Sequence, residues 1–100
     1  MDLAELTDEL RRRAGQNVKL GYKVKFILDD GIIFWDGTDS PPVISNDDGG
    51  DVNTTIKITA ENLQKLMAGG LDPTMAYMTG KLKVEGSMGV ALKLTSMFAD

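Results

Sequence analysis

Hydrophobic residues at the start of the chain recur at helical spacing. One set of apolar side chains is separated by three or four positions and consists of Leu3, Leu6, Leu10 and Ala14. Such spacing places the set on one face of a helix. Asp2 can cap this helix together with Glu5, in a variant of the capping box, and Gly15 suits the left-handed position that ends a helix. The pattern predicts a helix over residues 3–14.

After residue 17 the helical period gives way to alternation. Val24, Phe26 and Leu28 share one face of a predicted strand, whereas the lysines between and before them share the other. The turn signal Asp29-Asp30-Gly31 follows this strand. The apolar run of residues 32–35 is therefore expected to be the second strand of a hairpin.

Two further strands are expected before the next helix. Pro41-Pro42 cannot donate to a sheet ladder, so a short third strand begins only afterwards, at residues 43–45. Residues 46–51 have the composition of a loop. Residues 52–59 then alternate apolar and polar side chains as a fourth strand. We expect these four strands to form a meander.

Helical spacing returns at Thr59, which is a residue type that caps helices. An apolar stripe follows and stops at Gly69-Gly70. A second, short helix is marked by Asp72-Pro73, because Asp supplies the cap and Pro fits the first turn without losing a needed donor. Gly80 ends this helix.

A fifth strand and a last helix complete the pattern. Residues 81–85 alternate, with Leu82 and Val84 expected to face inward, and Gly86-Ser87 turns the chain into a helix. The last helix, residues 88–99, carries apolar side chains around most of its circumference, whereas an ordinary surface helix needs a stripe about 100° wide. It therefore packs in the core with some apolar surface exposed, contacts a partner, or lines an apolar ligand.

Composition narrows the classes of function. The chain has 100 residues, the length of one domain over residues 1–100, and it contains neither Cys nor His. Their absence removes disulfides, thiol nucleophiles, imidazole ligands and the usual neutral-pH base. The net charge of −4 argues against a nucleic-acid partner. The basic run Arg11-Arg12-Arg13 ends the first predicted helix, where cations face the negative end of the helix dipole.

No catalytic or metal-binding pattern is present. The acidic residues fall in turns and on solvated faces, where their pKa values are not tuned for acid–base catalysis. The acidic stretches of residues 36–39 and 47–51 do not match a calcium-binding loop. No run of apolar residues is long enough to span a bilayer, and the acidic start lacks the features of a signal peptide. We expect no enzymatic activity, no cofactor, no metal and a cytoplasmic location.

The C-terminal half carries a recognisable segment. Residues 70–94, GLDPTMAYMTGKLKVEGSMGVALKL, closely resemble the C-terminal signature of the sterol carrier protein type 2 domain family. The order of predicted elements before the segment is also similar to that family. The resemblance implies an α+β fold with a five-stranded, mostly antiparallel sheet, helices packed on one face, and an apolar tunnel between the two layers.

The resemblance also implies a function. Family members bind fatty acids, fatty acyl-CoA, phospholipids, sterols or isoprenoid lipids and carry or present them without chemistry of their own. Carried over by position, the tunnel wall is expected to comprise Phe26, Phe34, Ile56, Met75, Met78, Met88, Ala91, Leu92 and Thr95. Peroxisomal relatives end in an address signal, whereas this chain ends Phe98-Ala99-Asp100, which leaves the cytoplasm as the expected location.

Two hypotheses follow from these observations. The first is an intracellular lipid carrier that holds a long-chain apolar ligand and makes at most transient contact with membranes. The second is an interaction module whose apolar last helix docks onto a partner enzyme or onto a second copy in a homodimer. A monomer with stoichiometric lipid favours the first, and a lipid-free oligomer favours the second.

Overall fold

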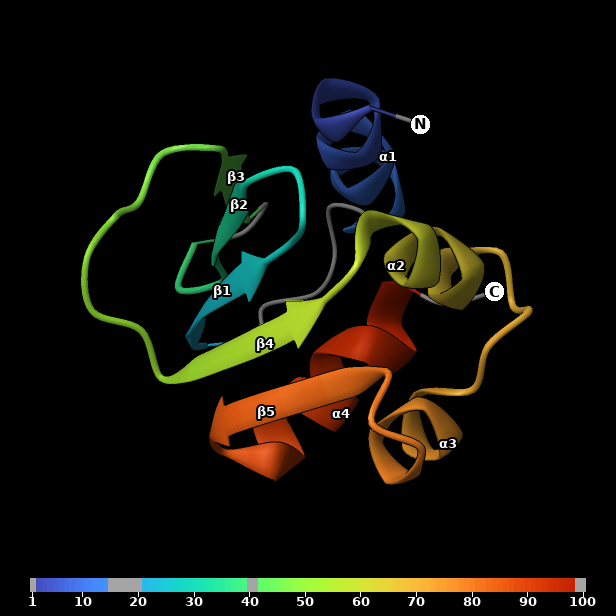
Figure 1. Ribbon diagram of the computed structural model, residues 1–100. Coiled ribbons are helices and arrows are strands. Elements are labelled where there is room, and N and C mark those ends of the chain that lie inside the picture. Colours follow the sequence, from blue (N-terminus) through green and yellow to red (C-terminus); the bar gives the residue numbers. More distant parts are fainter. Residues whose placement is uncertain (1, 15–20, 40–41, 99–100) are drawn as a thin grey trace.

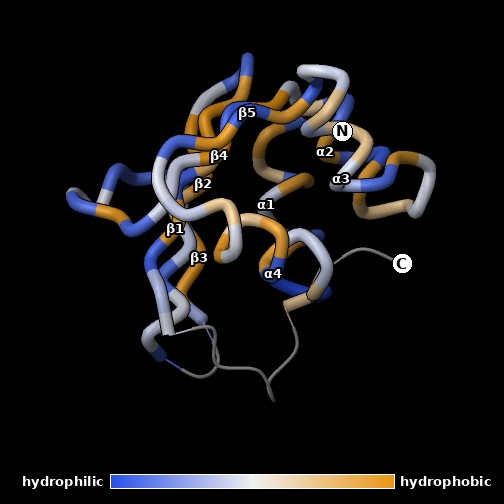
Figure 2. The backbone as a smooth tube through the Cα atoms, turned by 90° about the horizontal axis from the view of Figure 1, so that it is seen from below, coloured by the Kyte–Doolittle hydropathy of each residue, from blue (hydrophilic) through white to orange (hydrophobic). Residues whose placement is uncertain are grey.

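The computed structural model describes residues 2–14, 21–39 and 42–98. A sheet forms one layer and the helices form the other, all on the same face of the sheet (Figures 1 and 2). The elements, in chain order, are α1 (Leu3–Ala14), β1 (Lys23–Ile27), β2 (Ile32–Asp36), β3 (Val43–Ser45), β4 (Thr54–Ile58), α2 (Ala60–Met67), α3 (Pro73–Met78), β5 (Leu82–Gly86) and α4 (Met88–Phe98). Each predicted helix and strand is therefore present, although the fourth strand is shorter than the predicted residues 52–59 and residue 99 of the predicted last helix lies outside the described residues.

The predicted helix caps are confirmed where the structure describes them. Glu5 donates its backbone N–H to Asp2 Oδ1 at 2.8 Å, and Asp2 donates its own N–H to Glu5 Oε1 at 3.3 Å. Thr59 Oγ1 accepts the N–H of Asn62 at 3.1 Å, at the start of α2. These bonds satisfy amide groups that the first turn of a helix leaves without partners. The predicted end of α1 at Gly15 lies outside the described residues.

The sheet is mixed, with strand order β3-β2-β1-β4-β5. Three of its four strand pairs are antiparallel, but β1 and β4 are parallel. The expected meander of four strands is therefore wrong, because β4 crosses over to the free edge of β1 and does not pair with β3. Asn53 fixes this junction, since its N–H donates to Lys23 O and its side-chain oxygen accepts the N–H of Lys23, both at 2.9 Å.

One face of the sheet is apolar and covered by the helices. Phe26 pairs with Ile33 of β2 on one side and with Ile56 of β4 on the other, and all three side chains have 0% exposure. Residues directly opposite on neighbouring strands share a face, so this row continues through Val84 of β5, the partner of Ile56. The opposite face carries Lys25, Lys57 and Lys83, together with Glu85.

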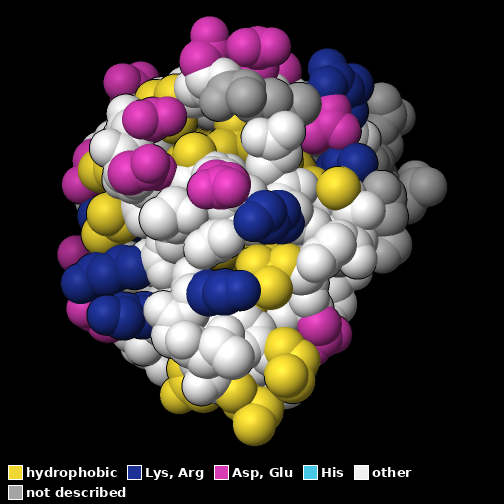
Figure 3. Space-filling model, turned by 45° about the vertical axis from the view of Figure 1, so that its right-hand side comes forward, with side chains coloured by type: hydrophobic (Ala, Val, Ile, Leu, Met, Phe, Trp, Pro, Cys, Tyr) yellow, Lys and Arg dark blue, Asp and Glu magenta, His cyan; other side chains and the backbone are white. Residues whose placement is uncertain are grey.

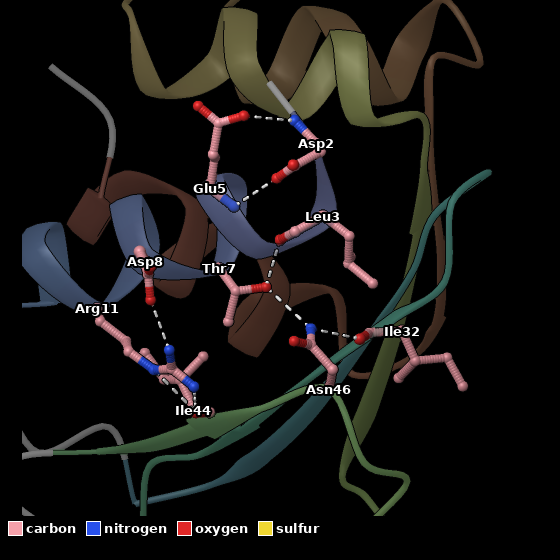
Figure 4. A network of polar contacts seen from close by, with 9 residues as sticks. All are labelled: Asp2, Leu3, Glu5, Thr7, Asp8, Arg11, Ile32, Ile44 and Asn46. Carbon is pink, nitrogen blue, oxygen red and sulfur yellow. Dashed lines mark hydrogen bonds and ion pairs between the residues drawn. The ribbon is translucent and has the colours of Figure 1, made fainter.

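Helix α1 is attached to the edge strand β3 by side-chain hydrogen bonds (Figure 4). Arg11 donates to the carbonyl oxygen of Ile44 through Nε at 3.1 Å and through Nη2 at 2.6 Å. Asn46 donates its Nδ2 to Thr7 Oγ1 at 2.9 Å and to Ile32 O at 3.0 Å. An edge strand has unpaired backbone groups, and these bonds occupy part of that edge. Arg11 thus contacts the sheet and not only the helix end.

Candidate functional site

Helix α4 starts at a tight junction with β4 and β5. Gly86 adopts φ +97°, and a Cβ there would lie 2.5 Å from Asn53 O, so only glycine fits. Ser87 caps α4 by accepting the N–H of Val90 on Oγ at 3.2 Å. The N–H of Ser87 donates to Thr54 Oγ1, and that hydroxyl also lies 3.2 Å from the carbonyl oxygen of Ser87. The start of α4 is therefore fixed over β4.

The side chains of α4 fall into a buried face and a half-buried flank. Val90, Ala91, Leu94 and Thr95 form the buried face, with exposures between 0% and 8%. Met88 and Leu92 are half-buried. These two residues are one turn apart and lie next to Ala91 and Thr95 on the helix surface, so together they form the flank. The flank borders the buried face without being sealed into it.

The sheet supplies the opposite wall of this interface. Phe26 and Ile56 are partners on neighbouring strands, and both belong to the same apolar cluster as Ala91. Thr95 is 1% exposed, and its hydroxyl donates to Ala91 O at 2.9 Å within its own helix. The structure thus buries the predicted residues Phe26, Ile56, Ala91 and Thr95, and α4 contacts β4 of the sheet, with the Met88 and Leu92 flank half-buried.

Phe34 is placed elsewhere, and the expectation that it faces inward is wrong. It pairs with Lys25, so its side chain lies on the face of the sheet opposite the helices. A Cβ at Gly49 would lie 2.8 Å from the Phe34 ring, which shows that the loop after β3 packs closely over it. Its low exposure of 7% therefore comes from this loop and not from the helical layer.

Met75 and Met78 also lie apart from the other predicted residues. They are on α3, where Met75 is 53% exposed and Met78 is 71% exposed. Ala76 is the buried residue of this short helix. The structure therefore directs the two methionines toward the surface of the molecule, while α3 as a whole contacts α4 and β5.

Sequence reasoning missed Ile33 and Trp35, which lie on the helix-facing side of β2 with 0% exposure. Residues 32–35 are all apolar, so the pattern does not show which side chains of this strand face the helices. The turn does determine which side chains face the helices. The Leu28 N–H donates to Gly31 O at 2.8 Å, and this register places Phe26 opposite Ile33. Taking the register from the turn would have found both residues.

Polar chemistry is sparse at this interface. The hydrogen bonds from Lys25 and the Gly50 N–H lower the pKa of Asp48, and those from Arg12 and Arg13 lower the pKa of Glu9. Both carboxylates lie outside the interface between the layers. Within residues 2–14, 21–39 and 42–98, no three His, Cys, Asp or Glu side chains are placed to hold a metal ion. In the same residues, no helix is long and apolar enough to cross a bilayer.

A surface depression of about 250 Å³ is present on α2. It is lined by Glu61, Gln64, Lys65 and Ala68, all on the exposed side of the helix. This depression is open to solvent and lies outside the core, whereas the interface between α4 and the sheet is apolar and covered. We therefore take the α4–sheet interface as the candidate site.

The fold and the site define a class of protein, an α+β domain with an apolar interface between one helical layer and a five-stranded sheet. The family model of the SCP-2 sterol transfer family matches residues 7–99. The chain belongs to this family, which confirms the resemblance seen in residues 70–94. Membership implies lipid binding or transfer as the general function of the domain.

Individual relatives agree with this assignment. Hydroxysteroid dehydrogenase-like protein 2 of Danio rerio is 38% identical over 63 residues, which are 63% of this chain and 14% of that protein. The chain thus spans only a small part of this relative's length. Sterol Carrier Protein 2 from Yarrowia lipolytica, in its apo form, is 18% identical with a TM-score of 0.70, covering 97% of this chain and 78% of that one. Palmitated SCP2L2 from Aedes aegypti is 15% identical with a TM-score of 0.71, covering 100% and 96%.

Proposed function

We propose that this protein carries a lipid with a long apolar chain, held between α4 and the helix-facing side of the sheet. The observation that supports the proposal is the arrangement of α4 in a chain of the SCP-2 family. Its half-buried flank, Met88 and Leu92, borders buried apolar residues that belong to the same core cluster as Phe26 and Ile56. An acyl chain inserted along this flank would extend the apolar contacts already present.

Burial of hydrocarbon supplies enough free energy for such a site. A C16 acyl chain gains about 0.8 kcal/mol for each CH₂ that leaves water, or on the order of 10 kcal/mol before the costs of association. Shape and apolar surface then suffice for affinity, and no cofactor or catalytic group is needed. A fatty acyl ligand also agrees with SCP2L2 of Aedes aegypti, which has the same fold and whose structure was solved in palmitated form.

The first test is native mass spectrometry of gently purified protein, followed by organic extraction and lipid analysis of the same sample. A discrete adduct that disappears on extraction would support the carrier and would name the class of ligand. A clean apo mass that stays unchanged after incubation with fatty acids, acyl-CoA and quinones would contradict it.

Two leucines of α4 provide a matched pair of variants. Leu92 is half-buried on the flank, whereas Leu94 has 0% exposure in the core. We expect Leu92→Ala to weaken lipid binding by about tenfold with a small loss of stability. We expect Leu94→Ala to lower the free energy of unfolding by about 2–5 kcal/mol. Similar losses of stability in both variants, with lipid binding unchanged in Leu92→Ala, would show that the flank is ordinary core.

A second candidate function rests on the lengths of the relatives. The Danio rerio relative is named as a dehydrogenase-like protein, and this chain matches 14% of it. We propose as the alternative that the domain presents lipid to a partner enzyme and has no chemistry of its own. Sedimentation velocity separates both of these lipid-binding functions from a self-associating module, because a lipid-loaded monomer favours lipid binding and a lipid-free oligomer favours self-association.

A further inference from the structure

The two edges of the sheet differ in how they are covered. At the β3 edge, Pro42 precedes a strand of only three residues, and Arg11 of α1 donates twice to the carbonyl oxygen of Ile44. β5 forms the other edge, pairs with β4 along all five of its residues without a bulge, and contains no proline. Sheets usually protect such an edge, because its unpaired backbone groups are a template for another strand. Among the described residues, the β5 edge lacks the protection that the β3 edge has.

The segments before and after β5 leave this edge open. The N–H of Lys81 donates to Ala76 O at 2.8 Å, so the chain reaches β5 from α3 in the helical layer. The N–H of Ser87 donates to Thr54 Oγ1 at 3.2 Å, which directs the chain toward β4 and away from the free edge. Figure 1 shows β5 as the lowest strand of the sheet, with α3 near one end of it and the start of α4 near the other.

The charged side chains of β5 are complementary to a second copy of the same strand. Lys83 and Glu85 lie on the face of the sheet opposite the helices, one on each side of Val84. In an antiparallel pair with a two-fold axis at Val84, each Lys83 lies opposite Glu85 of the second copy. Opposite charges in such positions stabilise a strand pair, whereas like charges destabilise it. Lysine on an edge normally keeps identical chains apart, but here Glu85 gives each lysine a partner.

Apolar side chains lie at the same end of the molecule as the β5 edge. Val84 is half-buried beside the core, so pairing would cover the rest of it with Val84 of the second copy. α3 contacts β5, and its residues Met75, Tyr77 and Met78 have exposures of 53%, 46% and 71%. Figure 3 shows hydrophobic side chains gathered at the lower end of the molecule, where α3 and β5 lie.

The same register places α3 beside the second copy. With Val84 on the two-fold axis, residue 81 lies opposite residue 87, so α3 of one copy lies next to the start of α4 of the other. That start carries the half-buried side chain of Met88. A five-residue edge alone buries less than the roughly 800 Å² on each partner of a stable interface, and the exposed side chains of α3 add to it.

We propose that the chain forms a homodimer through antiparallel pairing of β5 with β5 of a second copy, which joins two five-stranded sheets into one. Lys83 and Glu85 form two symmetric ion pairs across the axis, and α3 packs on the second copy. The dimer needs no bound lipid and is therefore independent of the proposed function. Because β5 and α3 are short, the dimer should dissociate on dilution.

Reversal of the charges at positions 83 and 85 tests this register. Lys83→Glu makes both edge charges negative and Glu85→Lys makes both positive, so each variant alone brings like charges together in two symmetric places. We expect sedimentation velocity of the full chain to show a dissociation constant raised by about tenfold or more in either variant. An equal mixture of the two variants should dimerise like the parent, because each acidic edge then meets a lysine edge. Both substitutions combined in one chain should also restore the dimer.

Matched controls leave the edge unchanged. Glu85→Lys also removes the ion pair with Lys57, and Lys57→Gln removes that pair alone. Lys65→Glu reverses an exposed charge on α2. Both controls should dimerise like the parent, whereas Tyr77→Ser combined with Met78→Ser should raise the dissociation constant by about fivefold or more. All the substituted side chains are exposed, so the variants should keep the far-ultraviolet circular dichroism of the parent.

Several results would overturn the proposal. One is a parent that stays monomeric at every concentration up to about 1 mM, where even a weak dimer is populated. Others are a dimer that the β5 variants leave intact, equal weakening by the controls, or a mixture of the two variants that fails to dimerise. Native mass spectrometry separates the dimer from the carrier function. A lipid-free dimer with the expected pattern of variants supports the pairing while contradicting the carrier, and a lipid-loaded chain that stays monomeric does the reverse.

Discussion

We expect Gly86→Ala to destabilise the protein more than Gly50→Ala, although both glycines adopt φ +97°. The two positions differ in what a new methyl group would meet. At Gly86 a Cβ would lie 2.5 Å from Asn53 O and 3.2 Å from Thr54 Cα, whereas at Gly50 nothing lies within 4 Å. The pair therefore separates the cost of the backbone conformation from the cost of the collision.

The expected magnitudes follow from this difference. A left-handed conformation destabilises the folded state by about 1–2 kcal/mol for a residue with a Cβ. Alanine also lowers the conformational entropy of the unfolded chain, which stabilises the folded state by about 0.4–1 kcal/mol. Gly50→Ala should therefore lower the free energy of unfolding by about 1 kcal/mol. Gly86→Ala adds a collision with backbone, typically about 1–3 kcal/mol for overpacking, and should lose about 2–4 kcal/mol in all.

Urea unfolding followed by far-ultraviolet circular dichroism measures both values in one series. The fluorescence of Trp35, which is buried at 0% exposure, provides a second probe of the core. We also expect Gly86→Ala to reduce lipid binding, because relief of the collision moves the start of α4 away from β4. Equal losses of stability for the two variants would refute the view that close packing with Asn53 positions α4.

Three further outcomes are expected. Phe34→Ala should lower stability by about 3 kcal/mol or more and leave lipid binding unchanged, because the ring lies on the face opposite the helices; a parallel loss of lipid binding would contradict that placement. Asn46→Ala should cost about 1–2 kcal/mol in urea unfolding, because it removes the hydrogen bond to the buried Thr7 hydroxyl. Lys25 lowers the pKa of Asp48, so ionised Asp48 stabilises the fold at neutral pH and this contribution is lost as pH falls through the lowered pKa. Urea midpoints between about pH 6 and pH 2 should therefore fall less in Asp48→Asn than in the parent, and identical pH dependences would contradict this.

Local patterns in the sequence were sufficient for the elements and for the starts of three helices. Spacing of apolar residues, cap residues and turn residues each act within a few positions, and the structure confirms them at Asp2, Thr59 and Asp72. The neighbour of β4 could not be predicted in this way. Alternation in β4 predicts which side chains share a face, but it does not predict which strand pairs with β4. The pairing with β1 depends on Asn53 and on the path of the preceding loop.

The candidate site could be predicted only in part. The α4 residues are carried over from the family resemblance, and alternation with polar neighbours gives the inward faces of Phe26 and Ile56. Phe34 sits in an unbroken apolar run, where alternation has no phase and residue type is a poor guide. Its burial by the loop around Gly49 is a tertiary contact between distant segments. No local pattern in β2 or in the loop around Gly49 predicts that contact.

The parallel pairing of β1 with β4 has a consequence for how quickly the chain folds. The hairpin of β1 and β2 closes over a tight turn, so its contacts form early and at small entropic cost. Val24 and Thr54 are separated in sequence by β2 and β3, so their pairing closes a long loop. Contacts between residues so far apart in sequence slow folding, because the chain loses the entropy of loop closure before the contacts stabilise it. We therefore expect the pairing of β1 with β4, which joins the two halves of the sheet, to form later than the β1–β2 hairpin.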